Sequence, residues 1–526
     1  MSKIIIYDTT LRDGAQGEGI SFSVIDKLKI AERLIDAGAD YIEGGWPGSN
    51  PKDAQFFRSI RRVQKGSSRI VAFGSTRKPG ISAEQDANLR ALIASRTPTV
   101  TVFGKSWRFH VTDALRVTPR ENLEMISDSV RFLKSDGREV IFDAEHFFDG
   151  FKADPAYAVE TIKAAAAAGA DCIVLCDTNG GSMPWEIAAG VQAAGEAVPI
   201  SIGIHTHNDS ELAVANSVVA VQSGAVHVQG TINGYGERCG NANLCSVIPI
   251  LQLKLHKECL TSKSLGDLKA LSNFVDEIAN VVPNDRQPFV GRSAFAHKAG
   301  IHVDAVRKQT RTYEHIAPEE VGNVRRVLVS ELAGASSIIH KAERYGVNLT
   351  KQSPEIRKVT REIAELENRG FSFEGAEGSF ELLLRKNVGT YEKLFDLKSY
   401  RVIVEKRRRR KPITEAVLRV EVKGEDMLCV AEGDGPVHAL DGALRKALQR
   451  FYPELAHIKL TDFKVRVLNA KDGTAAGVRA IVESTDGTSS WSTVGVSTNI
   501  IEASWYALVD SVEYGLLRLM AKKEGA

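Results

Sequence analysis

From Lys3 to about Leu255 the chain alternates between short apolar runs and longer amphipathic segments of helix length. Apolar runs of four to eight residues predict buried strands, and apolar positions three and four apart predict helices. The expected strands are KIIIY, DYIEGG, RIVAFG, TVTVF, EVIFDA, DCIVLC, ISIGIH and AVHVQGT. The helical segments between them include SVIDKLKIAERLIDAG and PAYAVETIKAAAAAG, which close on a glycine as helix C-caps commonly do.

Eight strand–helix units in about 250 residues match the number and size of a TIM (β/α)8 barrel. A doubly wound sheet is the alternative α/β architecture. It usually needs fewer units and often carries GxGxxG after its first strand, a motif absent here. We therefore expect a barrel over residues 1–260.

Residues 261–411 change to a mostly helical pattern, which we interpret as linker subdomains. The segments are LGDLKALSNFVDEIANVV, the polar loop FAHKAGIHVDAVRK, SELAGASSIIHKAERYG and a charged helix from Ser353 to Asn368. The run KRRRRKP, Lys406 to Pro412, marks the end of this region, because like charges repel and proline stops a helix. We interpret it as a solvated linker rather than a nucleic-acid patch, since no aromatic residues are interleaved with it.

Residues 412–526 read as strands followed by a helix, twice over. The first set is AVLRVEVKG, DMLCVAEGDGP and VHALDGALRKALQRF; the second is FKVRVLNA, GVRAIVES, SSWSTVGVST and NIIEASWYALVDSVEYGLLR. This pattern predicts an α+β domain with an internal repeat. Such an appended module more often binds an effector or a partner than performs chemistry.

Polar residues cluster where the predicted barrel strands end. In a barrel the carboxyl ends of the strands form the catalytic face. The residues at these positions are Asp8, Arg12, Asp13, Glu43, Glu145, Asp177, Thr178, His205, His207 and the loop Asn233 to Asn241. Their number is the main evidence from the sequence for an active site at this rim.

The stretch from Ile204 to Leu244 indicates a divalent-metal site. His205 and His207 lie two apart at the end of a strand and therefore point to the same side. With Asp13 they supply two imidazoles and a carboxylate, and the glycine-rich loop brings Asn241 nearby, or into coordination. Positions would remain for water or a 2-keto acid, whose carbonyl the ion would polarise. The alternative is that the two histidines are ordinary rim residues.

Three further residues have candidate roles at the rim. Arg12 offers a positive fork for a carboxylate or an enolate oxygen, although it could form only a surface ion pair with Asp13. Thr178 could donate its hydroxyl to a substrate carboxylate. Glu145 could be a solvated rim residue, and Cys239 reads as a small loop residue rather than a nucleophile.

Composition narrows the class of protein. Of the 526 residues 43% are hydrophobic and 25% charged, and the net charge is +2, so no overall field attracts nucleic acid or anionic membrane. The six cysteines contain no CxxC pair, which points to a reducing compartment. We find no signal peptide and no apolar run near the ~18 residues that span a bilayer. We expect a cytoplasmic enzyme with small substrates.

Together YDTTLRDGAQ, HTHND and GTINGYGERCGN resemble the signatures of the DRE-TIM metallolyase superfamily. Within it the chain is similar to the acyl-CoA-dependent condensing branch of isopropylmalate, homocitrate and citramalate synthases. The resemblance covers nearly the whole chain, including FAHKAGIHVDA and the duplicated C-terminal domain. The stretch YIEGGWPGSNPKD looks most like citramalate synthases.

The resemblance implies roles for individual residues. Asp13, His205 and His207 match the family's ligands for Mg²⁺, Mn²⁺ or Zn²⁺, with Asn241 at the fourth position. Arg12 and Glu145 match catalytic residues, and Thr178 matches the threonine that holds the keto-acid carboxylate. By the same resemblance, His302 and Tyr313 match linker residues that reach the active site of the partner subunit in a homodimer.

The implied reaction is the condensation of acetyl-CoA with pyruvate and hydrolysis to (R)-citramalate and CoA, which opens a route to isoleucine. Isoleucine would then be the feedback effector at the C-terminal domain. Two departures bear on this: many relatives have Glu where this chain has Ala15, and Asp143 stands where pyruvate-selective relatives can carry an apolar side chain. An unpaired charge there would be costly beside a methyl group.

The alternatives belong to three classes. A 2-isopropylmalate synthase would use 2-ketoisovalerate in leucine biosynthesis, and pocket size differs by only a few methyl groups. A cleaving aldolase or acyl-CoA lyase could use the same barrel, but such relatives often lack the linker and the C-terminal domain. A scaffold or nucleic-acid protein using the basic run would bind in a salt-sensitive way.

Overall fold

The protein is described by a computed structural model that divides into two compact units. Unit 1 comprises Met1–Phe295 and Ile316–Val324, and unit 2 comprises Ala296–His315 and Arg325–Ala526. Within these units the structure describes residues 2–61, 69–298, 300–328, 338–339, 342–343, 349–350, 353–373, 376–406, 408, 411–468 and 476–524. Among them no helix combines the length and apolar character that crossing a bilayer requires.

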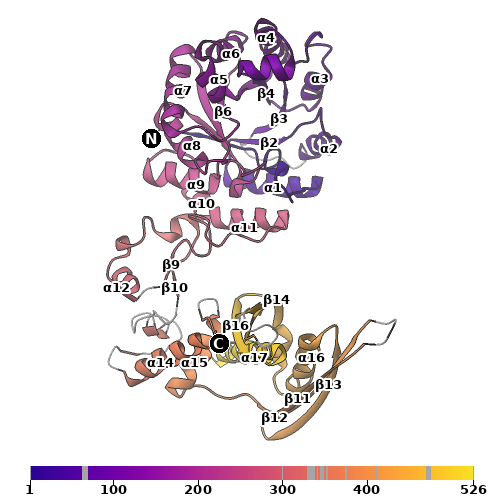
Figure 1. Cartoon of the computed structure of the whole chain (residues 1–526), viewed down its shortest axis with the longest axis vertical. Helices are drawn as coiled ribbons and strands as arrows, with labels where there is room; N and C mark the ends of the chain where they lie inside the picture. Colours follow the sequence, from indigo (N-terminus) through magenta and orange to yellow (C-terminus); the bar gives the residue numbers. More distant parts are fainter. Residues whose placement is uncertain are drawn as a thin grey trace. The chain divides into compact units, whose positions relative to one another are not determined.

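Unit 1 is built on a closed barrel of eight parallel strands in chain order, β1 to β8 (Figure 1). This confirms the predicted (β/α)8 architecture and rules out the doubly wound sheet. The strands are β1 (Ile5–Asp8), β2 (Tyr41–Gly45), β3 (Arg69–Ser75), β4 (Thr99–Lys105), β5 (Glu139–Glu145), β6 (Cys172–Asp177), β7 (Ser201–Thr206) and β8 (His227–Gly230). Each lies within about two residues of an apolar run in the sequence.

Helices surround the barrel in Figure 1 and pack their apolar faces on it to form one large core. Local signals set their ends: Ser23 makes a capping box, and Gly38 ends the first helix with a left-handed φ of 83°. The helices are α1 (Val24–Ala37), α2 (Pro51–Ile60), α3 (Ala87–Ala94), α4 (Pro119–Ser135), α5 (Phe147–Ala153), α6 (Pro155–Ala167), α7 (Pro184–Ala197), α8 (Ala213–Gln222), α9 (Leu244–Pro249), α10 (Ser262–Gly266) and α11 (Leu268–Ala279).

Short turns complete unit 1. The 3₁₀ turns are η1 (Gly14–Gln16), η3 (Ile232–Gly234) and η6 (Pro318–Val321), and the π turns are η2 (His110–Leu115) and η4 (Ile250–Lys254). Two of them, η1 and η3, follow the first and last barrel strands, so they shape the rim where those strands end.

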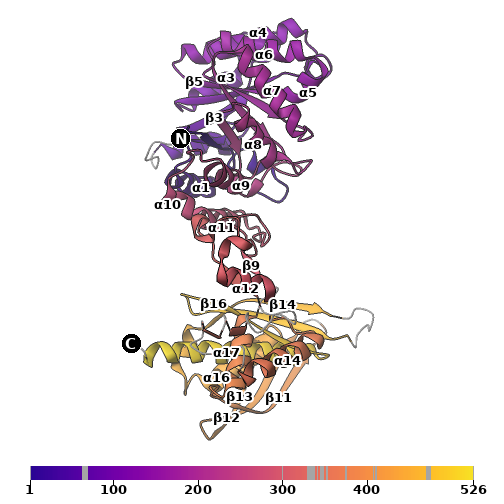
Figure 2. The same cartoon turned by 90° about the vertical axis from the view of Figure 1, so that its left-hand side faces the viewer.

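Unit 2 repeats one order of elements: three antiparallel strands, then a helix. The strands β11 (Asp396–Glu405), β12 (Ile413–Val422) and β13 (Glu425–Gly433) precede α16 (Pro436–Leu448), which packs on β12 and β13. The strands β14 (Lys459–Val467), β15 (Val478–Thr485) and β16 (Ser490–Ser497) precede α17 (Ile500–Glu524), which packs on β15 and β16 (Figure 2). The expected α+β domain with an internal repeat is therefore present.

The structure adds one strand to the region that we expected to be mostly helical. Residues 396–405 form β11, although we expected mostly helical structure up to residue 411. β11 lies at a sheet edge and most of its residues are exposed, so its alternation of apolar and polar residues is weak. With β11, both halves of the repeat have three strands.

The remaining elements of unit 2 are β9 (Ala296–His297), α12 (Gly300–Lys308), η5 (Thr310–Thr312), β10 (Arg326–Val327), α14 (Pro354–Asn368), α15 (Glu377–Val388) and η7 (Pro453–His457). The helix expected from Ser353 to Asn368 is confirmed as α14. Most of SELAGASSIIHKAERYG and much of KRRRRKP lie outside the described residues. The predicted boundaries at residues 260 and 411 stay predictions.

Candidate active site

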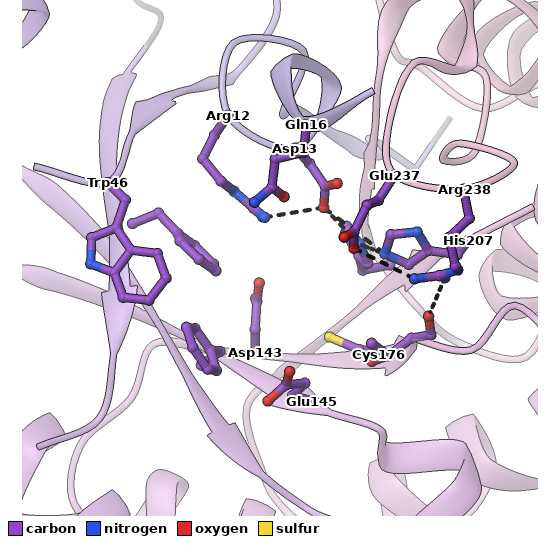
Figure 3. A pocket seen from close by; sticks show the side chains of 14 residues that line it. Arg12, Asp13, Gln16, Trp46, Asp143, Glu145, Cys176, His207, Glu237 and Arg238 are labelled. Carbon is purple, nitrogen blue, oxygen red and sulfur yellow. Dashed lines mark hydrogen bonds and ion pairs between the residues drawn. The ribbon is translucent and has the colours of Figure 1, made fainter. Parts of the chain in front are cut away.

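A pocket of about 230 Å³ opens at the carboxyl ends of the barrel strands. Figure 3 shows Trp46 on one side of it and His207 on the other, with Arg12 and Asp13 between them. The lining residues are Arg12, Asp13, Gln16, Trp46, Phe73, Phe103, Asp143, Glu145, Cys176, Thr178, His205, His207, Glu237 and Arg238. The structure therefore brings together most of the residues that we singled out at strand ends.

Asp13, His205 and His207 converge as the sequence predicts. Asp13 Oδ2 lies 3.5 Å from His205 Nε2 and 4.0 Å from His207 Nε2. The two Nε2 atoms are 3.2 Å apart, and all three side chains are buried. Within the described part of the chain, they form the one group of three or more His, Cys, Asp or Glu side chains whose ligand atoms lie within 4.8 Å of one another.

The protonation states of this group suit a cation. Burial lowers the pKa of both imidazoles, and the pKa of His207 falls to about 4, so both are neutral near pH 7. His205 Nδ1 lies 2.9 Å from Gln229 Oε1, which favours a proton on Nδ1 and a lone pair on Nε2. Burial alone would raise the pKa of Asp13, but Arg12 and then the histidines outweigh it and lower that pKa to about 2.

Asn241 adds a fourth donor. Its Nδ2 donates to Tyr235 O at 3.0 Å, whereas its buried Oδ1 has no hydrogen-bond partner among the described residues. Glycine makes this placement possible, since a Cβ at Gly236 would lie 2.2 Å from Asn241 Nδ2. A buried carbonyl oxygen without a partner is costly, and a cation would satisfy it. The donor set of oxygen and imidazole nitrogen thus fits a divalent ion.

Arg12 is held by buried carboxylates rather than lying in a surface ion pair. Its Nε donates to Glu43 Oε2 at 2.6 Å and its Nη1 to Asp13 Oδ2 at 3.1 Å. Tyr7 donates to the other oxygen of Glu43 at 2.7 Å, and the guanidinium carbon lies 3.7 Å from the ring centre of Phe73. These contacts fix a positive charge at the pocket wall.

Glu145 and Thr178 also line the pocket. Glu145 ends β5 and forms an ion pair with Lys105 Nζ. Thr178 follows β6, and its Oγ1 accepts a hydrogen bond from the backbone N–H of His146 at 2.8 Å. Because this bond uses an acceptor site of the hydroxyl, the hydroxyl proton can be directed elsewhere, toward a ligand.

The surroundings of Asp143 disfavour a charge on it. Burial, with Glu43 nearby, raises the pKa of Asp143 well above its usual range, which favours the neutral carboxyl. Its Oδ1 accepts a hydrogen bond from Gln229 Nε2 at 3.1 Å. The raised pKa therefore reduces the expected cost of a charge beside a methyl group.

His302 and Tyr313 belong to unit 2, and neither lines the pocket. Their rings stack with centroids 4.1 Å apart. The proposed role of both residues at the partner's active site stays a prediction.

Sequence reasoning missed several residues of this site. Gln229 supports both His205 and Asp143, and its only signal was a polar residue inside an apolar strand. The packing of Trp46, Phe73 and Phe103 into one aromatic wall left no signal, because these residues come from the loop after β2, from β3 and from β4.

Comparisons with known proteins agree with the geometry. Residues 3–275 match the HMGL-like family, residues 289–370 the homocitrate synthase post-HMGL domain-like family, and residues 374–516 the LeuA allosteric (dimerisation) domain. The chain is 54% identical to an (R)-citramalate synthase of Geobacter sulfurreducens, with 98% of both chains covered. It is 52% identical to one of Aquifex aeolicus, again over 98% of both chains.

A 2-isopropylmalate synthase of Halalkalibacterium halodurans is more distant, at 31% identity over 97% of this chain and 96% of that protein. Both kinds of relative match nearly the full length of this chain, but the citramalate synthases share a much higher sequence identity with it than the 2-isopropylmalate synthase does. The chain therefore belongs to the HMGL-like family and, within it, to the (R)-citramalate synthases.

Proposed function

We propose that the protein condenses acetyl-CoA with pyruvate and hydrolyses the resulting thioester, releasing (R)-citramalate and CoA. The observation that carries this proposal is the buried group of Asp13, His205 and His207, which faces a pocket in a chain whose family is known. In sum, acetyl-CoA, pyruvate and water give citramalate, CoA and a proton.

Asp13, His205, His207 and Asn241 would hold a divalent ion, Mg²⁺, Mn²⁺ or Zn²⁺. When bound, such an ion acts as a Lewis acid on a keto carbonyl. The Thr178 hydroxyl donates to the carboxylate of the keto acid and so fixes its orientation. The contact of His205 Nδ1 with Gln229 Oε1 favours a proton on Nδ1 and so leaves the Nε2 lone pair of His205 available.

Glu145 takes a proton from the methyl group of acetyl-CoA, with His302 as the alternative base. The methyl carbon then forms a bond to the keto carbon of pyruvate. Arg12 stabilises the negative charge that develops on the thioester oxygen, because its guanidinium is already fixed by Glu43 and Asp13. Water finally cleaves the thioester, and CoA leaves.

The pocket wall favours a small keto acid. Phe73 and Phe103 stack with centroids 5.4 Å apart, and Trp46 meets both edge-on at 5.8 and 5.6 Å. Asp143 lines the same pocket, and burial raises its pKa and so favours the neutral carboxyl. This arrangement supports pyruvate over 2-ketoisovalerate, the substrate of the second candidate function.

The C-terminal unit carries the regulatory part of the proposal. The match to a LeuA allosteric (dimerisation) domain supports a homodimer. We propose that isoleucine, the end product of this route, binds there as the feedback effector, and that His302 and Tyr313 act at the active site of the partner subunit.

The experiment offers purified protein acetyl-CoA and a divalent metal with pyruvate, 2-ketoisovalerate or 2-ketoglutarate in turn, and measures thiol release. The proposal expects the highest kcat/KM with pyruvate. Preference for 2-ketoisovalerate would support 2-isopropylmalate synthase instead. Cleavage of added hydroxyacyl-CoA without condensation would support a lyase.

A further inference from the structure

Arg238 lies in the glycine-rich loop after β8 and binds residues from two other loops of the rim. Its Nε and Nη2 donate to the two oxygens of Asp209 at 2.8 and 2.9 Å. The same Nη2 donates to the backbone oxygen of Thr178 at 2.7 Å. One guanidinium therefore connects the loops that follow β6, β7 and β8.

These three loops carry residues of the proposed site. Thr178 lies on the first, Asp209 follows His207 on the second, and Arg238 precedes Asn241 on the third. Figure 3 shows the Arg238 guanidinium beside His207 at the edge of the pocket. Of the two residues that Arg238 hydrogen-bonds through its guanidinium, Asp209 and Thr178, only Thr178 lines the pocket, so a change at Arg238 can act on the pocket through Thr178.

Thr178 is fixed from two sides. The N–H of His146 binds its side-chain oxygen at 2.8 Å, and Arg238 binds its carbonyl oxygen at 2.7 Å. The first contact directs the hydroxyl, and the second holds the peptide that carries it.

The backbone is shaped for these contacts. Arg238 has a left-handed φ of 59° and His146 one of 56°, conformations that cost energy in residues other than glycine. Gly180 lies so close to Asp209 that a Cβ would be 2.5 Å from its Oδ2. The side chains of Arg238 and Asp209 are 40% and 24% exposed, so their ion pair adds little to the free energy of unfolding. Its main effect is to hold the Arg238 guanidinium in place.

We propose that Arg238, anchored by Asp209, is a positioning residue that sets the Thr178 hydroxyl for the carboxylate of the 2-oxo acid. This inference rests on the proposed function, because it takes the substrate carboxylate as the ligand of Thr178. Arg238 acts through Thr178 and not by touching the substrate.

The test compares Arg238→Met and Asp209→Asn with the wild-type enzyme. Arg238→Met raises the KM for the 2-oxo acid about tenfold, as expected for misplacing one hydrogen bond to a charged group, and changes the KM for acetyl-CoA less than about twofold. Asp209→Asn gives a smaller rise in the same direction, because the bond from Arg238 to Thr178 O remains.

A second comparison separates positioning from direct contact. In a Thr178→Val background the hydroxyl is gone, so Arg238→Met has no further effect on the KM for the 2-oxo acid. A full further loss in that background would show that Arg238 binds the substrate itself and would overturn the inference.

Arg138 provides a matched control at the opposite end of the barrel. It also binds a carboxylate, Asp136, at 2.8 Å and two backbone oxygens, those of Thr97 and Ile93. Arg138→Met lowers the Tm and leaves both KM values unchanged. If Arg238→Met also changes only the Tm, or raises both KM values alike, the inference is wrong.

Thiol release by the wild-type enzyme distinguishes a failure of the proposed reaction from a failure of the positioning role of Arg238. If another 2-oxo acid replaces pyruvate as the better substrate, the acceptor assignment fails and the same comparisons are made with that acid. If no thiol is released, the proposed function fails, and calorimetric titration of pyruvate into the Mg²⁺-loaded variants tests the positioning role by the same tenfold weakening.

Discussion

Glu139 and Asn241, at opposite ends of the barrel, differ in whether their side-chain oxygens have hydrogen-bond donors within the protein. At the amino ends of the strands, Glu139 accepts hydrogen bonds from Arg69 Nη1, the Tyr41 hydroxyl and the Thr99 hydroxyl. At the carboxyl ends, the Oδ1 of Asn241 has no partner among the described residues, and two neutral imidazole nitrogens face each other at 3.2 Å.

This difference in hydrogen bonding suggests that paired polar groups contribute to stability, whereas unpaired ones are kept for binding a ligand. Paired groups at the amino end satisfy their hydrogen bonds inside the protein, so substitutions there change the free energy of unfolding. Unsatisfied groups at the carboxyl end cost stability and become satisfied only when a ligand binds. Strand β5 has a glutamate at each end: Glu139 begins it, and Glu145, which pairs with Lys105 and lines the pocket, ends it.

The largest expected effect comes from the metal ligands. Asp13→Ala or His207→Ala lowers pyruvate-dependent thiol release by at least about a thousandfold, because the Lewis acid is lost. Chelation of the wild-type enzyme does the same, and added Mg²⁺, Mn²⁺ or Zn²⁺ restores the rate. The far-ultraviolet circular dichroism spectrum stays unchanged. Full turnover in either variant would refute the metal assignment.

Two glutamates on β5 make the next comparison. Glu145→Gln lowers kcat about a hundredfold or more, as expected for a missing general base, with little loss of Tm. Glu139→Gln leaves kcat unchanged and lowers the Tm, since it weakens the contacts with Arg69, Tyr41 and Thr99. Steady-state kinetics and thermal melts check both. Equal losses of kcat would contradict the separation of the two ends.

Asp8, at the carboxyl end of β1, makes the free energy of unfolding depend on pH. Burial raises the pKa of Asp8 from its ordinary 3.8 to about 7. The folded state therefore holds its proton longer than the unfolded state, and stability is lost as the pH rises from about 4 through 7, by about 1.4 kcal/mol for each unit of pKa shift.

Asp8→Asn removes this dependence, so urea midpoints of the variant and the wild type diverge as the pH rises toward 8. The exposed Asp36→Asn on α1 serves as the control and leaves the pH dependence as in the wild type. A constant gap between Asp8→Asn and wild type across this range would show that the carboxyl is already ionised in the fold.

The smallest effect is expected at Asp143. Burial raises the pKa of this carboxyl and favours its neutral form, so the neutral Asp143→Asn changes the KM for pyruvate less than about threefold. The same steady-state measurements with 2-ketoisovalerate show whether the variant changes the preference between the two keto acids. A tenfold rise in the KM for pyruvate would mean that the group works as a carboxylate.

The sequence predicted what short-range periodicity determines. All eight barrel strands and the convergence of Asp13, His205 and His207 followed from apolar runs, strand ends and the spacing of two histidines. β11 was missed because an exposed edge strand has a weak apolar pattern.

What depends on tertiary contacts did not follow from the sequence. The raised pKa of Asp143 arises from burial, which outweighs the hydrogen bond that Gln229 donates from another strand. The contact of Arg238 with Thr178 joins loops 60 residues apart, and no spacing rule relates them.

The most direct test of the account is calorimetric titration of pyruvate into the purified protein, with and without a divalent metal. We expect one binding site per chain in the metal-loaded protein, and none after chelation or in His207→Ala. Binding of equal strength in the chelated protein would contradict the claim that Asp13, His205 and His207 hold the ion that binds the 2-oxo acid.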